Sequence, residues 1–230
     1  MADVAQLVER RFVVPVVAGS IPVVRPRGFP AEIPSAHLTD FIEMIITALI
    51  LAGGKAARFG GADKAFVRLH GRPLIEHVLE QLRPQASPIA ISANGDPARF
   101  AAYGLPVLAD APEFSACGPL AGVAAGLCWA EGEGAEFLLT MPVDTPFFPQ
   151  TLVAELSPGP AVAVYAGRQH HLAALWPVAF RQGLEDFLRR DAKFKVRDAL
   201  TLCGARQVAF TGPRDPFANL NSPGELSVFE

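Results

Sequence analysis

The stretch Ile45-Ile46-Thr47-Ala48-Leu49-Ile50-Leu51-Ala52-Gly53-Gly54 decides the fold of this chain. Apart from Thr47 it is apolar as far as Leu51, which is typical of a central parallel strand that is buried on both faces. The two glycines allow the chain to turn where this strand ends. The apolar run is too short for a bilayer, since a membrane-spanning helix needs about 20 such residues. It therefore predicts the first strand of an α/β sheet, followed by a glycine-rich loop.

Strands and helices are expected to alternate after this first strand. Apolar runs predict further strands at 88–93, 105–108, 137–140, 162–165, 172–176 and 207–210, the pair 162–165 and 172–176 being joined through residues 167–169. Helical spacing and flanking prolines predict helices at 73–84, 96–102, 119–128, 180–190 and 195–200. This order predicts a three-layer, Rossmann-like α/β fold, with a mostly parallel sheet and helices on both faces.

Four residues that could contact a ligand fall just after the ends of predicted strands: Gly53, Asn94, Asp110 and Asp144. Sheets of this kind bind ligands outside the carboxyl ends of their strands. Asn94 reads either as a turn residue or as a contact to a base or ribose. Each aspartate reads either as a turn or helix-cap residue or as a ligand of Mg²⁺, and one metal could be shared between Asp110 and Asp144.

The loop after the first strand carries two cations, Arg58 and Lys64, beside its glycines. Glycine lets backbone N–H groups approach phosphate, and two cations suit a triphosphate with about four negative charges. The loop lacks the Gly-Lys-Ser/Thr ending of a P-loop and the GxGxxG spacing of a dinucleotide site. A plain tight turn with solvated charges is the alternative.

The composition excludes several classes of partner. The chain has 230 residues, half of them hydrophobic. Its net charge is −3, so it lacks the excess of basic residues that binding to nucleic acid or to an anionic membrane would require. Its three cysteines include no CxxC pair, which argues against a disulfide framework or a zinc site and favours buried, unreactive thiols. We therefore expect a soluble, cytoplasmic protein.

Residues 1–43 stand apart from the rest. They hold five prolines within twenty residues and no sustained periodicity. Parts of the segment 4–22 resemble the peptide read from a transfer-RNA gene, and Met44 directly precedes the first strand. We interpret Met44 as the true start and residues 1–43 as a spurious extension, with a genuine disordered or targeting tail as the alternative. Residues 44–230 are expected to form a single domain.

Six motifs, taken in order, resemble those of molybdenum cofactor guanylyltransferases. They are Leu51-Ala52-Gly53-Gly54 with Arg58 to Lys64, Gly71-Arg72-Pro73-Leu74, Ala93-Asn94, Gly118-Pro119-Leu120-Ala121-Gly122, Pro142-Val143-Asp144-Thr145-Pro146 and the segment from Phe217-Ala218-Asn219 to Leu226. The similarity covers about residues 45–228. It implies a nucleotidyltransferase domain with a fold like that of nucleotide-diphospho-sugar transferases.

The resemblance also implies an activity, the transfer of GMP from Mg-GTP to molybdopterin with release of pyrophosphate. The residues implied to contact GTP are Leu51, Ala52, Gly53, Gly54, Lys64, Asn94, Asp110 and Asp144. Asp144 would hold Mg²⁺, and Arg58, Lys64 and Asp144 would be the catalytic residues. Other molybdenum cofactor biosynthesis proteins and molybdoenzyme chaperones are possible partners.

The implied acceptor-binding residues are His170, Lys195, Arg197, Asn219 and Asn221. For Lys195 and Arg197 a solvated helix face is an equal alternative. The chain departs from the family here, since His171 stands where proline is usual and Leu172 where a small hydroxyl residue is usual.

Three other functions stay open at this point. A cytidylyltransferase for the same cofactor usually has alanine at the position of Gly53. A sugar-1-phosphate nucleotidylyltransferase is usually longer. A non-catalytic nucleotide-binding module would be expected to lose the metal carboxylate, which Asp144 retains.

Overall fold

The computed structural model describes residues 44–53, 63–190 and 194–220. The extension 1–43 and the expected site residues Gly54, Arg58 and Asn221 lie outside the described residues. Within them, seven strands form the main sheet: β1 (Ile46–Leu51), β4 (Ile89–Ser92), β5 (Val107–Leu108), β6 (Phe137–Pro142), β7 (Ala161–Tyr165), β8 (Arg168–Pro177) and β9 (Arg206–Phe210). The helices are α1 (Leu74–Leu82), α2 (Pro119–Gly132), α3 (Leu152–Leu156), α4 (Arg181–Arg190) and α5 (Val196–Leu202).

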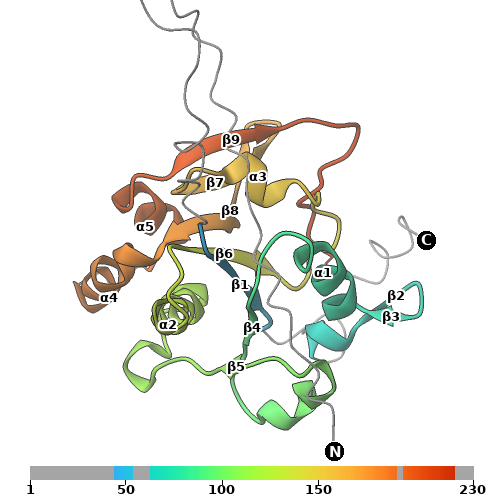
Figure 1. Ribbon diagram of the computed structural model, residues 1–230, viewed down its shortest axis with the longest axis horizontal. Helices are drawn as coiled ribbons and strands as arrows, with labels where there is room; N and C mark the ends of the chain where they lie inside the picture. Colours follow the sequence, from blue (N-terminus) through green and yellow to red (C-terminus); the bar gives the residue numbers. More distant parts are fainter. Residues whose placement is uncertain (1–43, 54–62, 191–193, 221–230) are drawn as a thin grey trace, which may run out of the picture.

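The strand order β5-β4-β1-β6-β8-β7-β9 confirms the expected mostly parallel sheet (Figure 1). Strands β5, β4, β1 and β6 run parallel, and β7 pairs in parallel with β9. Strand β8 runs antiparallel to both of its neighbours, β6 and β7. The strand at 45–51 is central, because it pairs with β4 on one side and with β6 on the other.

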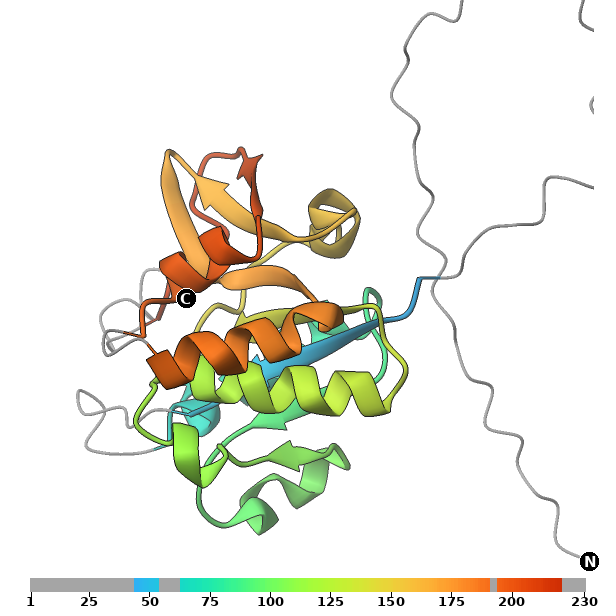
Figure 2. The same cartoon turned by 90° about the vertical axis from the view of Figure 1, so that its left-hand side faces the viewer.

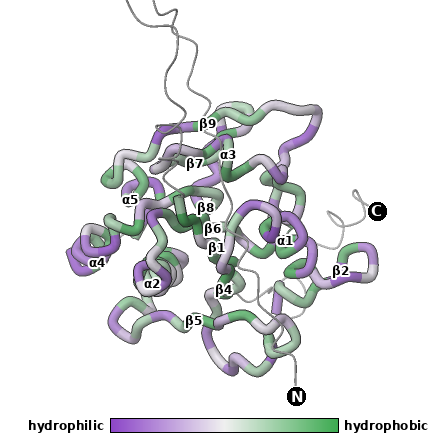
Figure 3. Tube along the Cα trace, viewed as in Figure 1, coloured by the Kyte–Doolittle hydropathy of each residue, from purple (hydrophilic) through white to green (hydrophobic). Residues whose placement is uncertain are grey.

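Helices cover both faces of the sheet, which confirms the three layers. In Figures 1 and 2, α2, α4 and α5 lie on one side of the sheet, and Figure 1 places α1 and α3 on the other. The side chains of β1 explain this arrangement. Ile46, Ala48 and Ile50 belong to the core beneath α1 and α3, whereas Leu49 and Leu51 belong to the core beneath α2, α4 and α5. Figure 3 accordingly shows the hydrophobic stretches of the chain gathered in the central strands.

The hairpin between β7 and β8 differs from the prediction. The turn consists of Ala166 and Gly167, both with positive φ, as a two-residue hairpin with its strand twist requires. Strand β8 therefore begins at Arg168, a residue that the sequence placed in the connection. The pairing of β8 with β7 then shifts, because Ala163 faces His170 whereas Val162 faces Ala174. Residues 171–173 consequently form a bulge in β8.

Several short elements were not predicted. Strands β2 (Arg68–Leu69) and β3 (Arg72–Pro73) form a small hairpin through His70 and Gly71, which both have positive φ. Four 3₁₀ turns are present among the described residues: η3 (Lys64–Phe66), η4 (Pro97–Tyr103), η5 (Pro112–Phe114) and η6 (Val178–Phe180). Of these, η4 falls on the helix expected at 96–102. No helix of the described ranges is both long and apolar enough to cross a membrane.

Candidate active site

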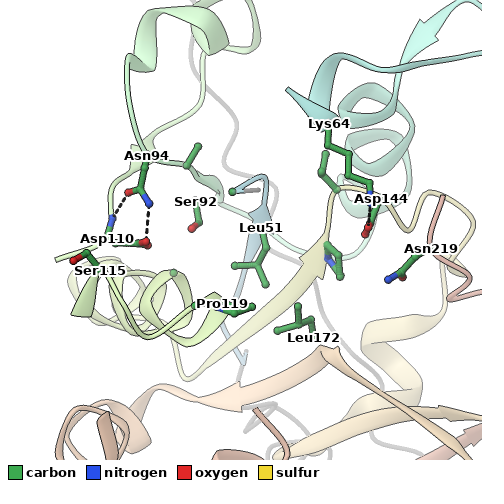
Figure 4. Close-up of a pocket in the computed structure, with 16 residues that line it drawn as sticks. Leu51, Lys64, Ser92, Asn94, Asp110, Ser115, Pro119, Asp144, Leu172 and Asn219 are labelled. Atoms are coloured by element: carbon green, nitrogen blue, oxygen red, sulfur yellow. Dashed lines mark hydrogen bonds and ion pairs between the residues drawn. The ribbon is translucent and has the colours of Figure 1, made fainter. Parts of the chain in front are cut away.

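A cavity of about 480 Å³ opens at the carboxyl ends of the parallel strands (Figure 4). This volume lies within the range typical of small-molecule sites. Six of the expected GTP contacts line it: Leu51, Gly53, Lys64, Asn94, Asp110 and Asp144. Ala52, by contrast, is buried and is not part of the lining. The parallel topology brings these residues together, because it places the ends of β1, β4, β5 and β6 along one edge of the sheet.

Lys64 and Asp144 face each other on one side of the cavity. Asp63 caps η3 by accepting a hydrogen bond from the amide of Ala65, which fixes the turn on which Lys64 stands. The Nζ atom of Lys64 lies 2.5 Å from Oδ2 of Asp144, and both side chains are mostly shielded from solvent. The backbone of Asp144 is held by the amide of Leu220, which donates to its carbonyl oxygen at 2.9 Å. The pair places one positive and one negative group side by side in the lining of the cavity.

Asn94 and Asp110 form a second pair, on the opposite side of the cavity in Figure 4. The amide nitrogen of Asn94 donates to Oδ2 of Asp110 at 2.7 Å. In return, the backbone N–H of Asp110 donates to Oδ1 of Asn94 at 2.9 Å. Asn94 therefore clamps the end of β4 to the segment after β5 and fixes the carboxylate of Asp110.

The structure does not bring Asp110 and Asp144 together around one metal. Asp110 follows β5 and Asp144 follows β6, and three steps along the sheet separate these strands, about 14 Å at the usual strand spacing. Among the described residues, no group of three or more His, Cys, Asp and Glu side chains could hold a metal by itself. Asp144 alone still fits Mg²⁺ that arrives on a triphosphate, because this ion commonly takes one or two carboxylates and fills its other positions with phosphate oxygens and water.

The start of α2 forms a third wall of the cavity through Gly118, Pro119 and Gly122. Gly118 precedes the helix with φ of 60° and ψ of −142°, a conformation that is essentially restricted to glycine. A Cβ atom on Gly122 would lie 2.4 Å from Oγ of Ser92. Gly122 is therefore needed for the close approach of α2 to β4, which supports a packing role for this part of the motif.

A second cavity, of about 240 Å³, adjoins the first and shares Pro142, Leu172 and Asn219 with it. Its further lining includes Thr145, Arg168, His170, His171, Val196 and Phe217. Of the expected acceptor-binding residues, His170 and Asn219 thus line this cavity, whereas Lys195 and Arg197 are not part of the lining. Lys195 precedes α5 as its N-cap residue, and the mostly exposed Arg197 pairs with Asp198.

The side chain of His170 is largely shielded from solvent. Its side chain is 8% exposed, its Nε2 lies 3.3 Å from Oδ2 of Asp215, and its ring packs on Phe217. Burial lowers the pKa of the His170 imidazole below its ordinary value, and the nearby Asp215 carboxylate opposes that shift. Burial likewise lowers the pKa of His171, with Arg197 and Arg168 acting in the same direction. The second cavity therefore favours neutral imidazoles beside the charged Arg168.

Sequence reasoning missed Arg168 and His171 as lining residues. Arg168 was assigned to the connection between two strands, and His171 was noted only as a departure from the family. Arg168 is the first residue of β8, directly after the hairpin turn, and His171 lies in the bulge at 171–173, which carries no recognisable sequence signal.

Comparisons with known proteins show which family this chain resembles. The sequence model of one protein family, the MobA-like NTP transferase domain, matches residues 48–208. A molybdenum cofactor guanylyltransferase from Acidiphilium cryptum is 49% identical over 185 residues, which cover 80% of this chain and 94% of that protein. Another guanylyltransferase, from Rhodobacter capsulatus, is 49% identical over 188 residues, which cover 81% of this chain and 96% of that protein.

Among solved structures, the molybdopterin-guanine dinucleotide biosynthesis protein A of Archaeoglobus fulgidus superposes with a TM-score of 0.58 at 20% identity, covering 80% of this chain and 96% of that one. This likeness bears on the fold alone, and it confirms the expected resemblance to the nucleotide-diphospho-sugar-transferase fold.

Proposed function

Because the chain belongs to the family of MobA-like NTP transferases, we propose that it is a molybdenum cofactor guanylyltransferase. The reaction is the transfer of GMP from Mg-GTP to the terminal phosphate of molybdopterin, with release of pyrophosphate. The observation that carries this proposal is the Lys64–Asp144 pair, held at the strand ends within the larger cavity. A module that only binds nucleotides has no need of this carboxylate.

Two groups of this chain would act on the triphosphate. The ammonium group of Lys64 offers a compact positive charge to phosphate oxygens, which stabilises negative charge as it shifts during transfer. The carboxylate of Asp144 would hold Mg²⁺. The ion, when bound, supplies further positive charge and orients the phosphates. The part of Arg58 in the same task stays a prediction, because that residue lies outside the described ranges.

The acceptor needs little activation, because a phosphate group is already anionic and nucleophilic at pH 7. The protein's main contribution is then alignment of the two reactants. The two cavities meet at Pro142, Leu172 and Asn219, so a nucleotide in the larger one and a phosphorylated acceptor in the smaller one would meet next to Asp144. Arg168 and the neutral imidazole of His170, which both line the smaller cavity, would bind the acceptor.

The fixed carboxylate of Asp110 favours GTP over CTP. Guanine carries two adjacent donors, the N1–H and the 2-amino group, and a carboxylate accepts from both. Cytosine has one amino donor beside an unprotonated ring nitrogen, which a carboxylate repels. The side-chain amide of Asn94 donates to Oδ2 of Asp110, and the backbone N–H of Asp110 donates back to Asn94, so the carboxylate cannot easily turn away from the wrong base.

The test is an assay of pyrophosphate release by the purified chain with Mg²⁺, molybdopterin and either GTP or CTP. We expect release with GTP that depends on molybdopterin. Release with CTP alone would instead assign the chain to cytidylyl transfer. Release that does not require molybdopterin, or that requires a sugar 1-phosphate, would overturn the assignment of the acceptor.

A further inference from the structure

Arg99 connects two walls of the nucleotide cavity without lining it. It stands on η4, and its Nε donates to Oδ2 of Asp63 at 2.9 Å. Its two terminal nitrogens donate to backbone carbonyl oxygens, Nη1 to Asp96 at 2.6 Å and Nη2 to Asn94 at 2.7 Å. The side chain is 28% exposed. Arg99 lies outside the six motifs and is not among the lining residues, so it has no part in the expected site.

The partners of Arg99 are the supports of the two polar pairs in the cavity. Asp63 directly precedes Lys64 and caps the turn that presents it to Asp144. Asn94 offers its backbone oxygen to Arg99 and its side chain to Asp110. The guanidinium thus links the Lys64–Asp144 pair to the Asn94–Asp110 pair.

Aromatic packing reinforces the same seam between η3 and η4. Phe66 of η3 stacks on Phe100 of η4 with ring centroids 5.3 Å apart. The guanidinium of Arg99 lies over the ring of Phe100, 4.6 Å from its centroid. Because this contact and the three hydrogen bonds fix the guanidinium, the relative position of the two walls depends on its planar shape.

We infer that Arg99 is a positioning residue that sets the spacing between the phosphate-holding and the base-holding sides of the cavity. The inference rests on the proposed function for the identity of the ligand. Arginine suits the task because its rigid fork donates in several directions at once, to Asp63 on one wall and to Asn94 and Asp96 on the other. Lysine carries one charge on a flexible stem and cannot hold both walls in one geometry.

The chain offers a matched control in Arg206. Its guanidinium donates to the carbonyl oxygens of Glu155, Leu156, Ser157 and Pro158, away from both cavities. Arg206→Ala therefore removes a comparable set of hydrogen bonds from a part of the fold that does not support the site. We expect it to lower the melting temperature and to leave the KM for GTP unchanged.

The experiment compares Arg99→Ala, Arg99→Lys and Arg206→Ala by steady-state kinetics and by equilibrium binding of Mg-GTP. Misplacement of binding groups by an ångström costs up to about 10²-fold. For both Arg99 variants we expect the KM and the Kd for GTP to rise about tenfold or more, with a smaller loss of kcat. In combination with Asp63→Asn, Arg99→Ala should add less than it costs alone, because the two residues share the contact between Nε of Arg99 and Oδ2 of Asp63.

A folded Arg99→Ala protein with the wild-type Kd for Mg-GTP would overturn the inference. So would an equal rise in the Kd for Arg206→Ala, because the effect would then follow general stability. If the wild-type chain binds Mg-GTP but releases no pyrophosphate, the proposed function fails, and the binding constants of the variants still decide the role of Arg99.

Discussion

Asp144 and its neighbour Thr145 together connect three parts of the site. It pairs with Lys64, its backbone oxygen accepts from Leu220, and the neighbouring Thr145 donates to Oδ1 of Asn219. The sequence predicted Asp144 from its place after an apolar run between two prolines. It could not predict these partners, because they come from segments that are distant in the chain.

Asp144→Ala should reduce turnover by about 10²-fold or more, on the scale of the loss of one preorganised electrostatic group. The loss has two causes, since the expected metal ligand is removed and the ion pair with Lys64 is broken. The measurement is kcat with saturating Mg-GTP and molybdopterin, with a thermal melt to verify folding. Near-wild-type turnover of the folded variant would contradict the role of the carboxylate.

Asp110→Asn should weaken the discrimination between GTP and CTP. The amide can present a donor to the ring nitrogen of cytosine, whereas the carboxylate accepts only. We expect the ratio of kcat/KM for GTP over CTP to fall by about tenfold, as the loss of one base contact of 1–3 kcal/mol implies. An unchanged ratio would show that other residues select the base.

His170 should make the stability of the fold depend on pH. Its pKa in the folded protein lies below the ordinary value of about 6.5, so the unfolded chain binds the proton more readily. The neutral imidazole therefore stabilises the fold above about pH 6.5, and this contribution is lost as the pH falls below that value. His170→Gln should lose less free energy of unfolding between pH 7 and pH 5 than the wild type does. Urea unfolding at several pH values measures this, with the exposed His70→Gln as control, and an unchanged pH dependence would contradict it.

At the scale of elements, helix α2 packs on the sheet through glycines. The sequence reveals that these residues are small, but it does not reveal which side chains they contact. A Cβ on Gly126 would lie 2.5 Å from Cδ2 of Leu49 and 2.9 Å from Cδ2 of Leu138, and both leucines are fully buried. These side chains have no room to move aside, so the contacts fix how closely the helix lies against β1 and β6.

Gly126→Ala should therefore destabilise the protein by about 1–3 kcal/mol, the usual cost of an overpacked core. Gly132→Ala, at the end of the same helix, meets nothing within 4 Å and should stabilise the protein by up to about 1 kcal/mol through helix propensity.

Gly122→Ala would press on Ser92, which lines the cavity, so it should also raise the KM for GTP. Chemical denaturation and steady-state kinetics separate the three cases. A stabilised Gly126→Ala protein would disprove the packing argument.

The elements that the sequence predicted are those whose signal is local. The apolar run at 45–51 predicts a buried strand, and Pro119 begins α2 as expected. Helix α3 was missed because its five residues are too few to show a period, and β2 and β3 because each has only two. The start of β8 was misplaced because positive φ at Ala166 is not visible in the residue type.

The residues of the candidate site likewise separate into those with a local sequence signal and those without one. Parallel strands bring Asn94, Asp110 and Asp144 to one edge, so their place after predicted strands was sufficient to find them. Arg168 reaches the smaller cavity beside a bulge, and Arg99 supports the larger one through tertiary contacts. Neither position follows from spacing along the chain.

At the scale of the whole molecule, the three cysteines differ in how far the fold buries them. Cys117 is buried and Cys203 is half-buried, and burial raises the pKa of Cys203 to about 11. Burial also raises the pKa of Cys117. Cys128 is exposed on α2, which corrects the expectation that all three thiols are buried.

The native protein should thus react quickly with a thiol reagent at Cys128 alone, and the unfolded protein at all three positions. Thiolates rather than thiols react, so a raised pKa slows the other two. Mass spectrometry after brief labelling at pH 8 locates the modified residues, and Cys128→Ser serves as the control. Rapid labelling of Cys203 in the native protein would contradict the burial described here.

The contacts that Asn219 and Leu220 make with Thr145 and Asp144 have a consequence during synthesis on the ribosome. The side-chain oxygen of Asn219 accepts a hydrogen bond from the hydroxyl of Thr145, and Asn219 leaves the ribosome 74 residues after Thr145. A nascent chain can pair β1, β4 and β6 well before that point, and it still lacks one wall shared by both cavities. The lining of both cavities is therefore complete only when residues 217–220 have emerged.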